Sequence, residues 1–386
     1  MHNIFVLGGG LQALSVSRSL KEAGHNVVVM AGNKEPVKYS MYIDRYIPLN
    51  ISPKDKNFID VLCNYVSAFD CKLIIPMSDK LAEFLSFNRK QIEQKTNAIC
   101  AVMNYEILSI ALNKRSLLDF CKQNSLPHPK NIALENTVLK EAANYIGFPA
   151  LIKPDVSVGA RGITLVCNYE ELKAKIDSVT LKYGTCCLQE YIEHKGRPYY
   201  NVMLFRSKDG KILSSTVLEI MRYYPIKGGS SSLGRTISSP LLVQICSRTL
   251  DLLGWIGFAD FDVLQTEDGE YKIIEINPRV PASLRAAAIS GVNFPEIIVD
   301  YYLNGVTKTY KYEPGKYLRF LGLDLMWFLK SPNRFKVTPS WFTFLSKNLY
   351  YQEGGIYEWR AMIYSLFEGF CKIFDSRTRS EKKGMN

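Results

Sequence analysis

In the first hundred residues, short runs of apolar residues alternate with longer segments in which apolar residues recur at helical spacing. An apolar run at residues 3–7 (NIFVL) leads into glycines, and apolar positions then recur at helical spacing from Leu11 to Ala23. Gly24 ends that segment, and the apolar run HNVVVMA follows it. Strand, helix and strand in this order predict a β-α-β unit with parallel strands. We therefore expect a doubly wound, Rossmann-like α/β domain at residues 1–105.

The pattern is mixed from residue 106 to 308. Apolar runs rich in β-branched residues alternate with segments of helical periodicity, and turn signals such as Asp209-Gly210 separate neighbouring apolar runs. This texture is typical of an α+β domain. We expect two subdomains in it, at 106–190 and 191–308.

Residues 309–386 form a third region. Seventeen aromatic residues fall in the last 76 positions, where 13 Lys and Arg stand against 7 Asp and Glu. Apolar residues recur at helical spacing from Ile356 to Phe374, with charged residues largely opposite, which predicts an amphipathic helix. We expect a mainly helical extension whose amphipathic helix docks on the protein body. The alternative is contact with an anionic membrane leaflet.

Composition excludes several classes of protein. The chain has 386 residues, of which 47% are hydrophobic and 22% charged, and these values are typical of a folded protein of two or three domains. Nine cysteines are scattered without a CxxC pair, which indicates reduced thiols rather than a zinc or redox centre. No run approaches the roughly 18 apolar residues of a membrane span, and the apolar start is too short for a secretory signal. A cytoplasmic protein is expected, with peripheral contact at the inner membrane face as the alternative.

Two features that suggest nucleic acid or a dinucleotide carry little weight. The net charge of +11 has no base-stacking or groove-reading motif beside it, so we expect no nucleic-acid partner. The glycines of GGGLQAL, at a strand-to-helix turn, could contact a pyrophosphate. A dinucleotide fold, however, places an acidic residue at the end of the second strand, and that strand ends Met30-Ala31-Gly32. A structural turn is the simpler interpretation.

A second glycine loop offers a better phosphate site. The strand FPALIK ends in Lys153, and the loop DVSVGARGI follows it with a serine, an arginine and two glycines. Such a loop can cover a triphosphate with backbone amides and positive charge. A solvated hairpin is the alternative, but a lysine on a strand beside the loop argues against it, because buried lysine is rare unless paired. Further along, the apolar segment LQEYI could offer backbone groups to an adenine.

The strongest candidate site lies on a predicted hairpin. Asp262 lies on one strand of DFDVLQTEDGEYKIIEINPR, and Glu275 and Asn277 lie on the other. Residues two apart on a strand share a face, and a turn at Asp268-Gly269 brings Asp262 opposite them. Carboxylate and amide oxygens on rigid strands suit Mg²⁺. An ordinary polar face is the alternative, but carboxylates that face one another without a cation repel.

In this order, these motifs resemble the ATP-grasp ligases over roughly residues 105–305. The resemblance implies an α/β pre-domain followed by two subdomains that clasp ATP. It also implies Mg²⁺, or Mn²⁺ in its place, held by Asp262, Glu275 and Asn277. Arg279, in the EINPR run, would contact the transferred phosphate, and Lys153 would act with it. The nucleotide contacts implied by the resemblance are Lys114, Lys153, Ser157, Gly159, Arg161, Gly162, Gln189, Glu190, Tyr191 and Ile192.

Within that family the chain is most similar to single-chain carboxylate-amine ligases, which include D-aspartate ligases and enzymes encoded with surface-polysaccharide genes. The run RYYPIKGGSSSLG resembles a segment of that subgroup, whereas PYY follows the adenine segment where the family commonly has a second acidic residue. The resemblance implies ADP-forming amide synthesis through an acyl phosphate, with an amino acid and a cell-surface polysaccharide or peptidoglycan precursor as substrates. The side chains that we expect to contact substrate are Ser231, Ser232, Arg235 and Ser283.

Two other functions remain as alternatives. A carboxylase or an enzyme like carbamoyl-phosphate synthase would use the same lysines and metal with bicarbonate. A regulatory protein would bind the nucleotide without turnover, although the intact set of charged residues argues against that. The identity of the carboxylate and the amine, and the oligomeric state, do not follow from the residues.

Overall fold

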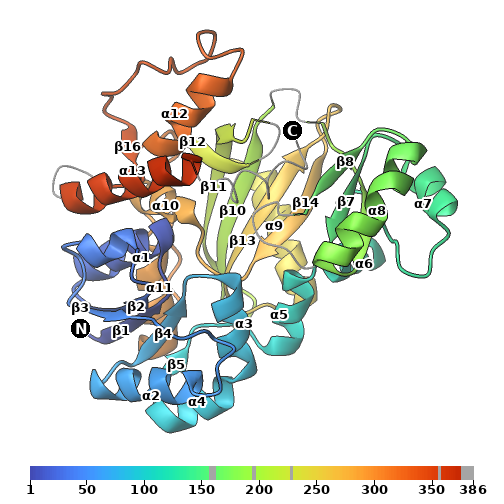
Figure 1. Cartoon of the computed structure of the whole chain (residues 1–386). Helices are drawn as coiled ribbons and strands as arrows, with labels where there is room; N and C mark the ends of the chain where they lie inside the picture. The colour runs from blue at the N-terminus through green and yellow to red at the C-terminus, as the bar shows by residue number, and fades with distance from the viewer. Residues whose placement is uncertain (156–161, 194–196, 227–228, 355–357, 375–386) are drawn as a thin grey trace.

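Three β-sheets organise the protein in the computed structural model (Figure 1). A five-stranded sheet lies at the lower left, a seven-stranded sheet in the centre and a four-stranded sheet at the right. The structure describes residues 1–155, 162–193, 197–226, 229–354 and 358–374, without the side chains of 368–374.

The five-stranded sheet is parallel throughout, in the order β3-β2-β1-β4-β5. Successive side chains of β1 enter different cores, because Ile4 packs in the cluster that includes α1 and α11, and Phe5 in the cluster that includes α2 and α3. Helices thus cover both faces, which confirms the doubly wound prediction. The elements are β1 (Asn3–Leu7), α1 (Gly10–Glu22), β2 (Asn26–Ala31), β3 (Arg45–Pro48), α2 (Phe58–Ala68), β4 (Leu73–Pro76), α3 (Asp79–Phe87), α4 (Arg89–Thr96), β5 (Ile99–Cys100) and α11 (Phe294–Asn304).

The glycine turn between β1 and α1 is tied to the chain's own carboxylate. The amide of Gly10 donates to Glu35 Oε2 at 2.7 Å, and a Cβ atom built on Gly9 would lie 2.2 Å from the Glu35 carboxyl carbon. Glu35 therefore lies where a phosphate would approach this turn. The arrangement supports the structural interpretation of the glycines.

The four-stranded sheet, in the order β6-β9-β7-β8, carries α7 and α8 and has a separate core. Its strands all pair antiparallel. This unit supplies one wall of the site. Its elements are β6 (Asn131–Ala133), α7 (Leu139–Ile146), β7 (Ala150–Pro154), β8 (Thr164–Val166), α8 (Tyr169–Tyr183) and β9 (Cys186–Glu190). The helices that lead into it are α5 (Tyr105–Leu112) and α6 (Lys114–Gln123).

The seven-stranded sheet, in the order β14-β13-β10-β11-β12-β15-β16, is antiparallel except for its last pair. Both turn signals named in the sequence join antiparallel strands of this sheet. Asp209-Gly210 lies between β10 and β11, and Asp268-Gly269 lies between β13 and β14. The elements are β10 (Tyr199–Arg206), β11 (Ile212–Tyr224), β12 (Ser230–Ile237), α9 (Pro240–Leu253), β13 (Gly257–Gln265), β14 (Tyr271–Asn277) and α10 (Arg285–Ile289).

The C-terminal extension is joined to this sheet rather than appended to it. Its strand β15 (Tyr317–Arg319) pairs with β12, and β16 (Leu349–Tyr351) pairs with β15. The helices α12 (Leu321–Lys330) and α13 (Trp359–Phe374) make up most of its regular structure, as the sequence predicts. The two strands were not predicted, since each has only three residues.

A buried ion cluster fixes the extension to the sheet. The carboxylate of Asp324, on α12, accepts hydrogen bonds from Arg319 Nε at 2.7 Å and from Arg222 NH1 at 3.2 Å. Ser232 Oγ on β12 donates to the same carboxylate at 3.2 Å. Asp324 has no exposed surface, and its burial raises the pKa of the carboxyl although both guanidinium groups oppose that shift. Removing one partner of such a buried charge cluster strongly destabilises the folded protein, because the remaining charge stays buried without compensation.

The amphipathic prediction for the last helix is correct in position and wrong in orientation. α13 rests on the protein through small side chains, with Ala361 fully buried and Ser365 5% exposed. Trp359, Ile363 and Phe367, predicted to lie on the packed face, are each more than half exposed. Among the described residues no helix is long and apolar enough to cross a membrane.

Candidate active site

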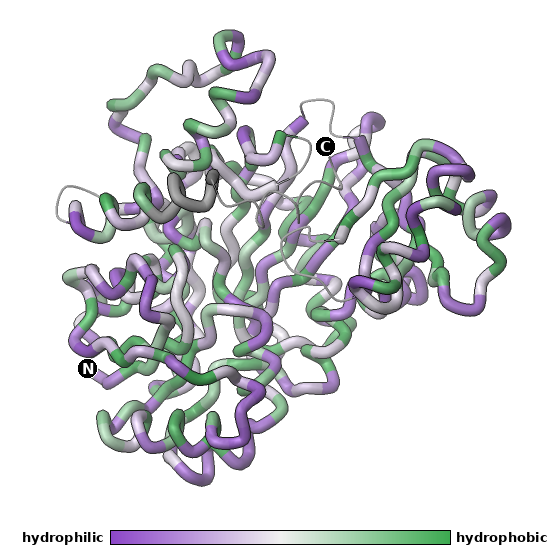
Figure 2. Tube along the Cα trace, viewed as in Figure 1, coloured by the Kyte–Doolittle hydropathy of each residue, from purple (hydrophilic) through white to green (hydrophobic). Residues whose placement is uncertain are grey.

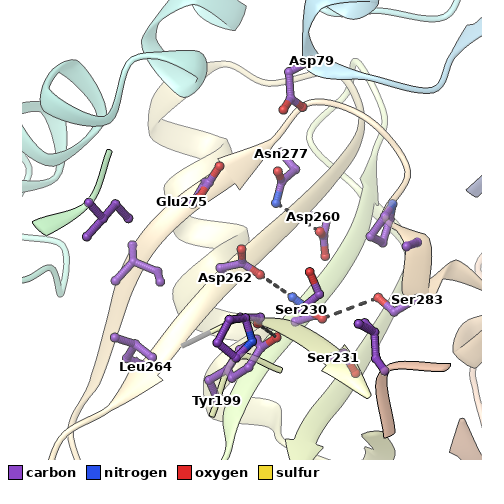
Figure 3. Close-up of a pocket in the computed structure, with 18 of the residues that line it drawn as sticks. Asp79, Tyr199, Ser230, Ser231, Asp260, Asp262, Leu264, Glu275, Asn277 and Ser283 are labelled. Carbon is purple, nitrogen blue, oxygen red and sulfur yellow. Dashed lines mark hydrogen bonds between the residues drawn. The ribbon is translucent and has the colours of Figure 1, made fainter. Parts of the chain in front are cut away.

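A cavity of about 450 Å³ lies where the seven-stranded sheet, the four-stranded sheet and the carboxyl ends of β1 and β4 meet. Parallel α/β sheets place ligand sites beyond the carboxyl ends of their strands. The side chains that line the cavity and are drawn with labels in Figure 3 are Asp79, Tyr199, Ser230, Ser231, Asp260, Asp262, Leu264, Glu275, Asn277 and Ser283.

The hairpin β13-β14 brings oxygen-bearing side chains together on one face. Asp262 pairs in register with Glu275, and Asp260 pairs with Asn277. Figure 3 shows the side chains of all four rising from the two strands into the cavity. The three residues predicted as metal ligands thus converge, and Asp260 joins them.

Asp260 was missed in the sequence, although it stands two residues before Asp262 and so shares its face. It is 1% exposed, and its Oδ2 accepts from Asn277 Nδ2 at 3.3 Å. Burial, reinforced by the charge of Asp262, raises the pKa of Asp260 well above its usual range. Burial, reinforced by Glu275, raises the pKa of Asp262 as well. Carboxylates in this arrangement gain from a bound cation.

The chemistry of this cluster fits a hard cation. Asp260 Oδ1 is buried without a hydrogen-bond partner among the described residues. Mg²⁺ accepts carboxylate and amide oxygens and completes its shell with water and phosphate oxygens. No three His, Cys, Asp or Glu side chains in the described part of the chain are arranged to hold a metal by themselves. A metal here would therefore use the Asn277 amide and oxygens from a phosphate ligand.

Two lysines reach this cluster from the opposite wall. Lys114, at the start of α6, lies with Nζ 3.6 Å from Glu275 Oε1. Lys153, on β7, donates to Gln189 Oε1 at 3.1 Å. Both are 6% exposed, which is unusual for lysine and typical of side chains kept for a ligand or a buried partner.

The environment of Lys153 predicts a pH dependence. Desolvation first, and then the charge of Lys114, lower the pKa of Lys153 to about 8. Its ammonium is therefore charged below pH 8 and loses its proton as the pH rises through 8. Because bound phosphates favour the charged form, we expect ATP affinity to fall above pH 8, by up to about tenfold per pH unit for one linked proton.

Calorimetric titration with ATP at pH 7 and pH 9.5 measures this dependence, and Lys153→Met is the control. The variant has no side chain at this position that titrates, so its affinity should change less than that of the wild type. Equal pH dependence in both proteins would assign the effect to another group.

The segment predicted to contact adenine, at residues 188–192, combines cavity-facing and outward side chains. Gln189, Tyr191 and Ile192 line the cavity. Glu190 faces away, because its Oε2 accepts from the Lys130 amide at 2.9 Å and lies 3.3 Å from Lys272 Nζ. The carboxylate of Glu190 is therefore committed to fixing β9, while the backbone beside it remains the candidate contact for a base. Apolar side chains that flank this end of the cavity are Leu151, Ile163, Leu264 and Ile274.

The predicted phosphate loop is described only at its end. Ser157, Gly159 and Arg161 lie outside the described residues. Gly162 lies within them and has φ of +76°, and a Cβ atom there would come within 2.9 Å of Pro154 and Tyr183. A larger residue at 162 would meet both strain and contact at this point.

Arg279 is held by groups on two domains. Its Nε donates to Asp79 Oδ1 at 3.0 Å, and its NH2 donates to Asn277 Oδ1 at 3.1 Å. Asp79 is the first residue of α3, shortly after β4. It was not predicted as a site residue, because no local sequence pattern links it to Arg279. The ion pair places the guanidinium beside the carboxylate cluster and joins the N-terminal domain to the site.

The predicted substrate side chains separate into two groups. Ser231 and Ser283 line the cavity, and Ser283 Oγ lies 3.5 Å from Asn201 Oδ1, which in turn contacts Asp262 through its amide nitrogen. The other two, Ser232 and Arg235, do not line it. Ser232 donates to the buried Asp324, and Arg235 NH2 pairs with Glu219 at 2.7 Å. Both are structural in this arrangement.

The C-terminal extension lines the end of the cavity farthest from the four-stranded sheet, which we call the far end. Leu318, Phe320, Leu323 and Gln352 line it. Gln352 is 3% exposed and donates to Ser15 Oγ at 3.1 Å, while its Oε1 has no hydrogen-bond partner among the described residues. This end therefore combines an apolar wall with a free buried carbonyl.

Most of these site residues lie within a region that matches a known family. The family model described as the ATP-grasp domain matches residues 111–283. The D-aspartate ligase of Enterococcus faecium is 22% identical over 322 residues, which are 76% of this chain and 75% of that protein.

Two solved structures are similar in fold. The biotin carboxylase domain of the Hydrogenobacter thermophilus 2-oxoglutarate carboxylase, in complex with MgADP, ADP and bicarbonate, superimposes with a TM-score of 0.68 at 18% identity, covering 82% of this chain and 73% of that one. The L-amino acid ligase of Bacillus licheniformis gives a TM-score of 0.62 at 14% identity, covering 82% of this chain and 78% of that one. At these identities the likeness concerns the fold.

Proposed function

Residues 111–283 match the ATP-grasp domain, and on that premise we propose that the chain is an ATP- and Mg²⁺-dependent ligase that joins a carboxylate to an amine and releases ADP. One observation carries this proposal. Two buried lysines, Lys114 and Lys153, face a cluster of carboxylates on the hairpin β13-β14 across one cavity. Positive charge for phosphates and oxygen ligands for a cation are thus available within one site.

The proposed chemistry has two steps. A substrate carboxylate oxygen attacks the γ-phosphorus of ATP, the bond to the β-phosphate oxygen breaks, and ADP and an acyl phosphate result. An amine nitrogen then attacks the acyl carbon, phosphate leaves, and the nitrogen loses a proton to give the amide. Bound Mg²⁺ supplies neutralising charge to the phosphates. The chain's part is to hold the groups in line and to keep Lys114, Lys153 and Arg279 as fixed positive charges away from water.

The second substrate would bind at the far end of the cavity. Ser231 and Ser283 offer hydroxyl groups there. Gln352 adds a carbonyl oxygen that has no hydrogen-bond partner in the described part of the chain and that suits an ammonium or amide N–H. Leu323 and Phe320 supply the apolar wall. We propose an amino acid as one of the two reactants, and a cell-surface polysaccharide or peptidoglycan precursor as the other. The similarity to a D-aspartate ligase supports this assignment.

The similarity in fold to a biotin carboxylase domain favours one alternative, an enzyme that uses bicarbonate. A fold similar to a domain whose structure holds MgADP and bicarbonate is compatible with bicarbonate as the carboxylate. ATP turnover that depends on bicarbonate and needs no other carboxylate would support this alternative.

ADP release from the purified protein with Mg-ATP tests the proposal. Pools of amino acids are added against pools of uronic acids and peptidoglycan precursors, with a separate bicarbonate series, and wild type is compared with Lys153→Ala. We expect turnover that requires both a carboxylate and an amine and that the variant loses. Tight ATP binding without turnover in any pool would contradict the ligase and favour a regulatory nucleotide-binding protein.

A further inference from the structure

The C-terminal extension exposes large apolar side chains at high density. Of 21 such side chains among the described residues, nine lie between positions 321 and 367. That segment is about an eighth of the chain, so chance exposure, which is common for single residues, does not account for the concentration. Figure 2 shows the apolar colour recurring along the upper loop of the extension and along the coloured part of α13.

The first part of this surface is the loop between α12 and β16, which we call the aromatic loop (residues 331–348). Phe335, Phe342 and Leu345 in it are 70%, 57% and 94% exposed. The rings of Phe335 and Phe342 both contact the ring of Phe328, with centroids 5.5 and 5.7 Å away, and the tilted Trp341 ring lies 4.2 Å from it. The rings therefore hold one another in place, and the loop presents apolar tips outward.

The second part is the stripe on α13 formed by Trp359, Ile363 and Phe367. These residues are spaced four apart, so they align along one side of the helix. α13 packs against α12 and against the 3₁₀ turn at Pro36–Tyr39, and the Tyr364 and Tyr39 rings lie 4.7 Å apart. The helix is therefore fixed in place with its apolar stripe turned outward.

The exposed charged side chains described between positions 321 and 367 are all basic. The acidic residues of this segment with described side chains, Asp324, Glu353 and Glu358, are at most 3% exposed. Its exposed charges are basic, and Arg334 also stands over the Phe335 ring at 5.3 Å. The exposed basic residues are Lys330, Lys336, Lys347 and Arg360.

Aromatic and aliphatic tips with a basic rim are the composition of surfaces that insert into the headgroup region of anionic bilayers. A protein partner of ordinary surface would present both signs of charge, whereas the described side chains of this segment include no exposed carboxylate to meet its cations. We propose that the aromatic loop and the α13 stripe dock the protein on an anionic membrane surface. The proposed docking does not depend on the proposed reaction. The helix α12 nevertheless connects the docking surface with the cavity, because its Leu323 lines the cavity while its Leu325 and Leu329 are exposed.

Co-sedimentation of the full chain with vesicles tests this docking. Vesicles of phosphatidylcholine alone are compared with an equal mixture of phosphatidylcholine and phosphatidylglycerol. We expect binding to the mixture only, and Leu345→Asp combined with Ile363→Asp should weaken it at least about tenfold, because two charges would have to enter the interface. Lys336→Glu combined with Lys347→Glu should weaken it through charge alone.

The matched control is Leu181→Asp, which places the same substitution at a 91% exposed leucine on α8, in the four-stranded unit. Its vesicle binding should equal that of the wild type. Equal loss in the control, binding without dependence on phosphatidylglycerol, or no binding would overturn the proposal. So would a dimer seen by light scattering that Leu345→Asp and Ile363→Asp abolish while vesicles remain unbound.

Failure of the docking and failure of the ligase are separate results. The docking variants lie outside the cavity, so ADP release in solution should stay at the wild-type rate. If the wild type binds vesicles but releases no ADP with any substrate pool, only the proposed reaction fails.

Discussion

Replacing Glu275 with alanine is expected to lower ADP release at least about 100-fold. The carboxylate stands opposite Asp262 and 3.6 Å from Lys114 Nζ, so its loss removes a proposed cation ligand and a carboxylate beside a buried lysine at once. A second measurement does not depend on turnover: Mn²⁺ binding in the presence of ATP, followed by electron paramagnetic resonance, should weaken in the variant.

The matched control is Glu270→Ala, on the same hairpin but at its exposed turn. It removes the same atoms without touching the cavity, so rate and metal binding should equal those of the wild type. A Glu275→Ala enzyme of full activity would remove the metal assignment, since no other described carboxylate stands in register with Asp262.

Replacing Asp324 with alanine is expected to destabilise the protein by about 3–5 kcal/mol, although it lies outside the cavity. The carboxylate is fully buried between Arg222 and Arg319, which are 3% and 1% exposed, and its loss leaves two buried guanidinium groups without their counter-charge. Urea unfolding followed by fluorescence measures the change.

Asp251→Ala serves as the comparison. Asp251 pairs with Arg206 Nε at 2.7 Å, but its side chain is 54% exposed. Water screens such a pair, so the expected cost is below about 1 kcal/mol. Equal midpoints for the Asp324 and Asp251 variants would mean that the buried cluster contributes no more than a surface ion pair.

The hairpin shows how far sequence reasoning reaches. A turn signal and a period of two were sufficient to bring Asp262 opposite Glu275, because hairpin register is local. The same period would have added Asp260 and separated Ser231 from Ser232, since neighbours on a strand point to opposite faces. Asp260 was omitted and Ser232 was wrongly included because the alternation of strand faces was applied to only some residues.

Other parts of the site depend on contacts that no local pattern records. Asp79 and Arg279 are 200 positions apart, and only the packing of the N-terminal domain on the sheet joins them. Gln352 reaches the cavity because the short strand β16 pairs beyond β15, a contact set by the whole sheet. The orientation of α13 could not be predicted either, because periodicity identifies an apolar face without saying what covers it.

The pairing of β15 with β12 also matters for how the protein avoids aggregation. Without the extension, β12 would end the sheet as an eight-residue strand with unpaired amides and carbonyls, a template for strands of other chains. β15 covers part of that edge and β16 replaces it with one of three residues. A fragment ending near residue 308 would keep every proposed ATP ligand yet expose this edge, so we expect it to self-associate more strongly than the full chain.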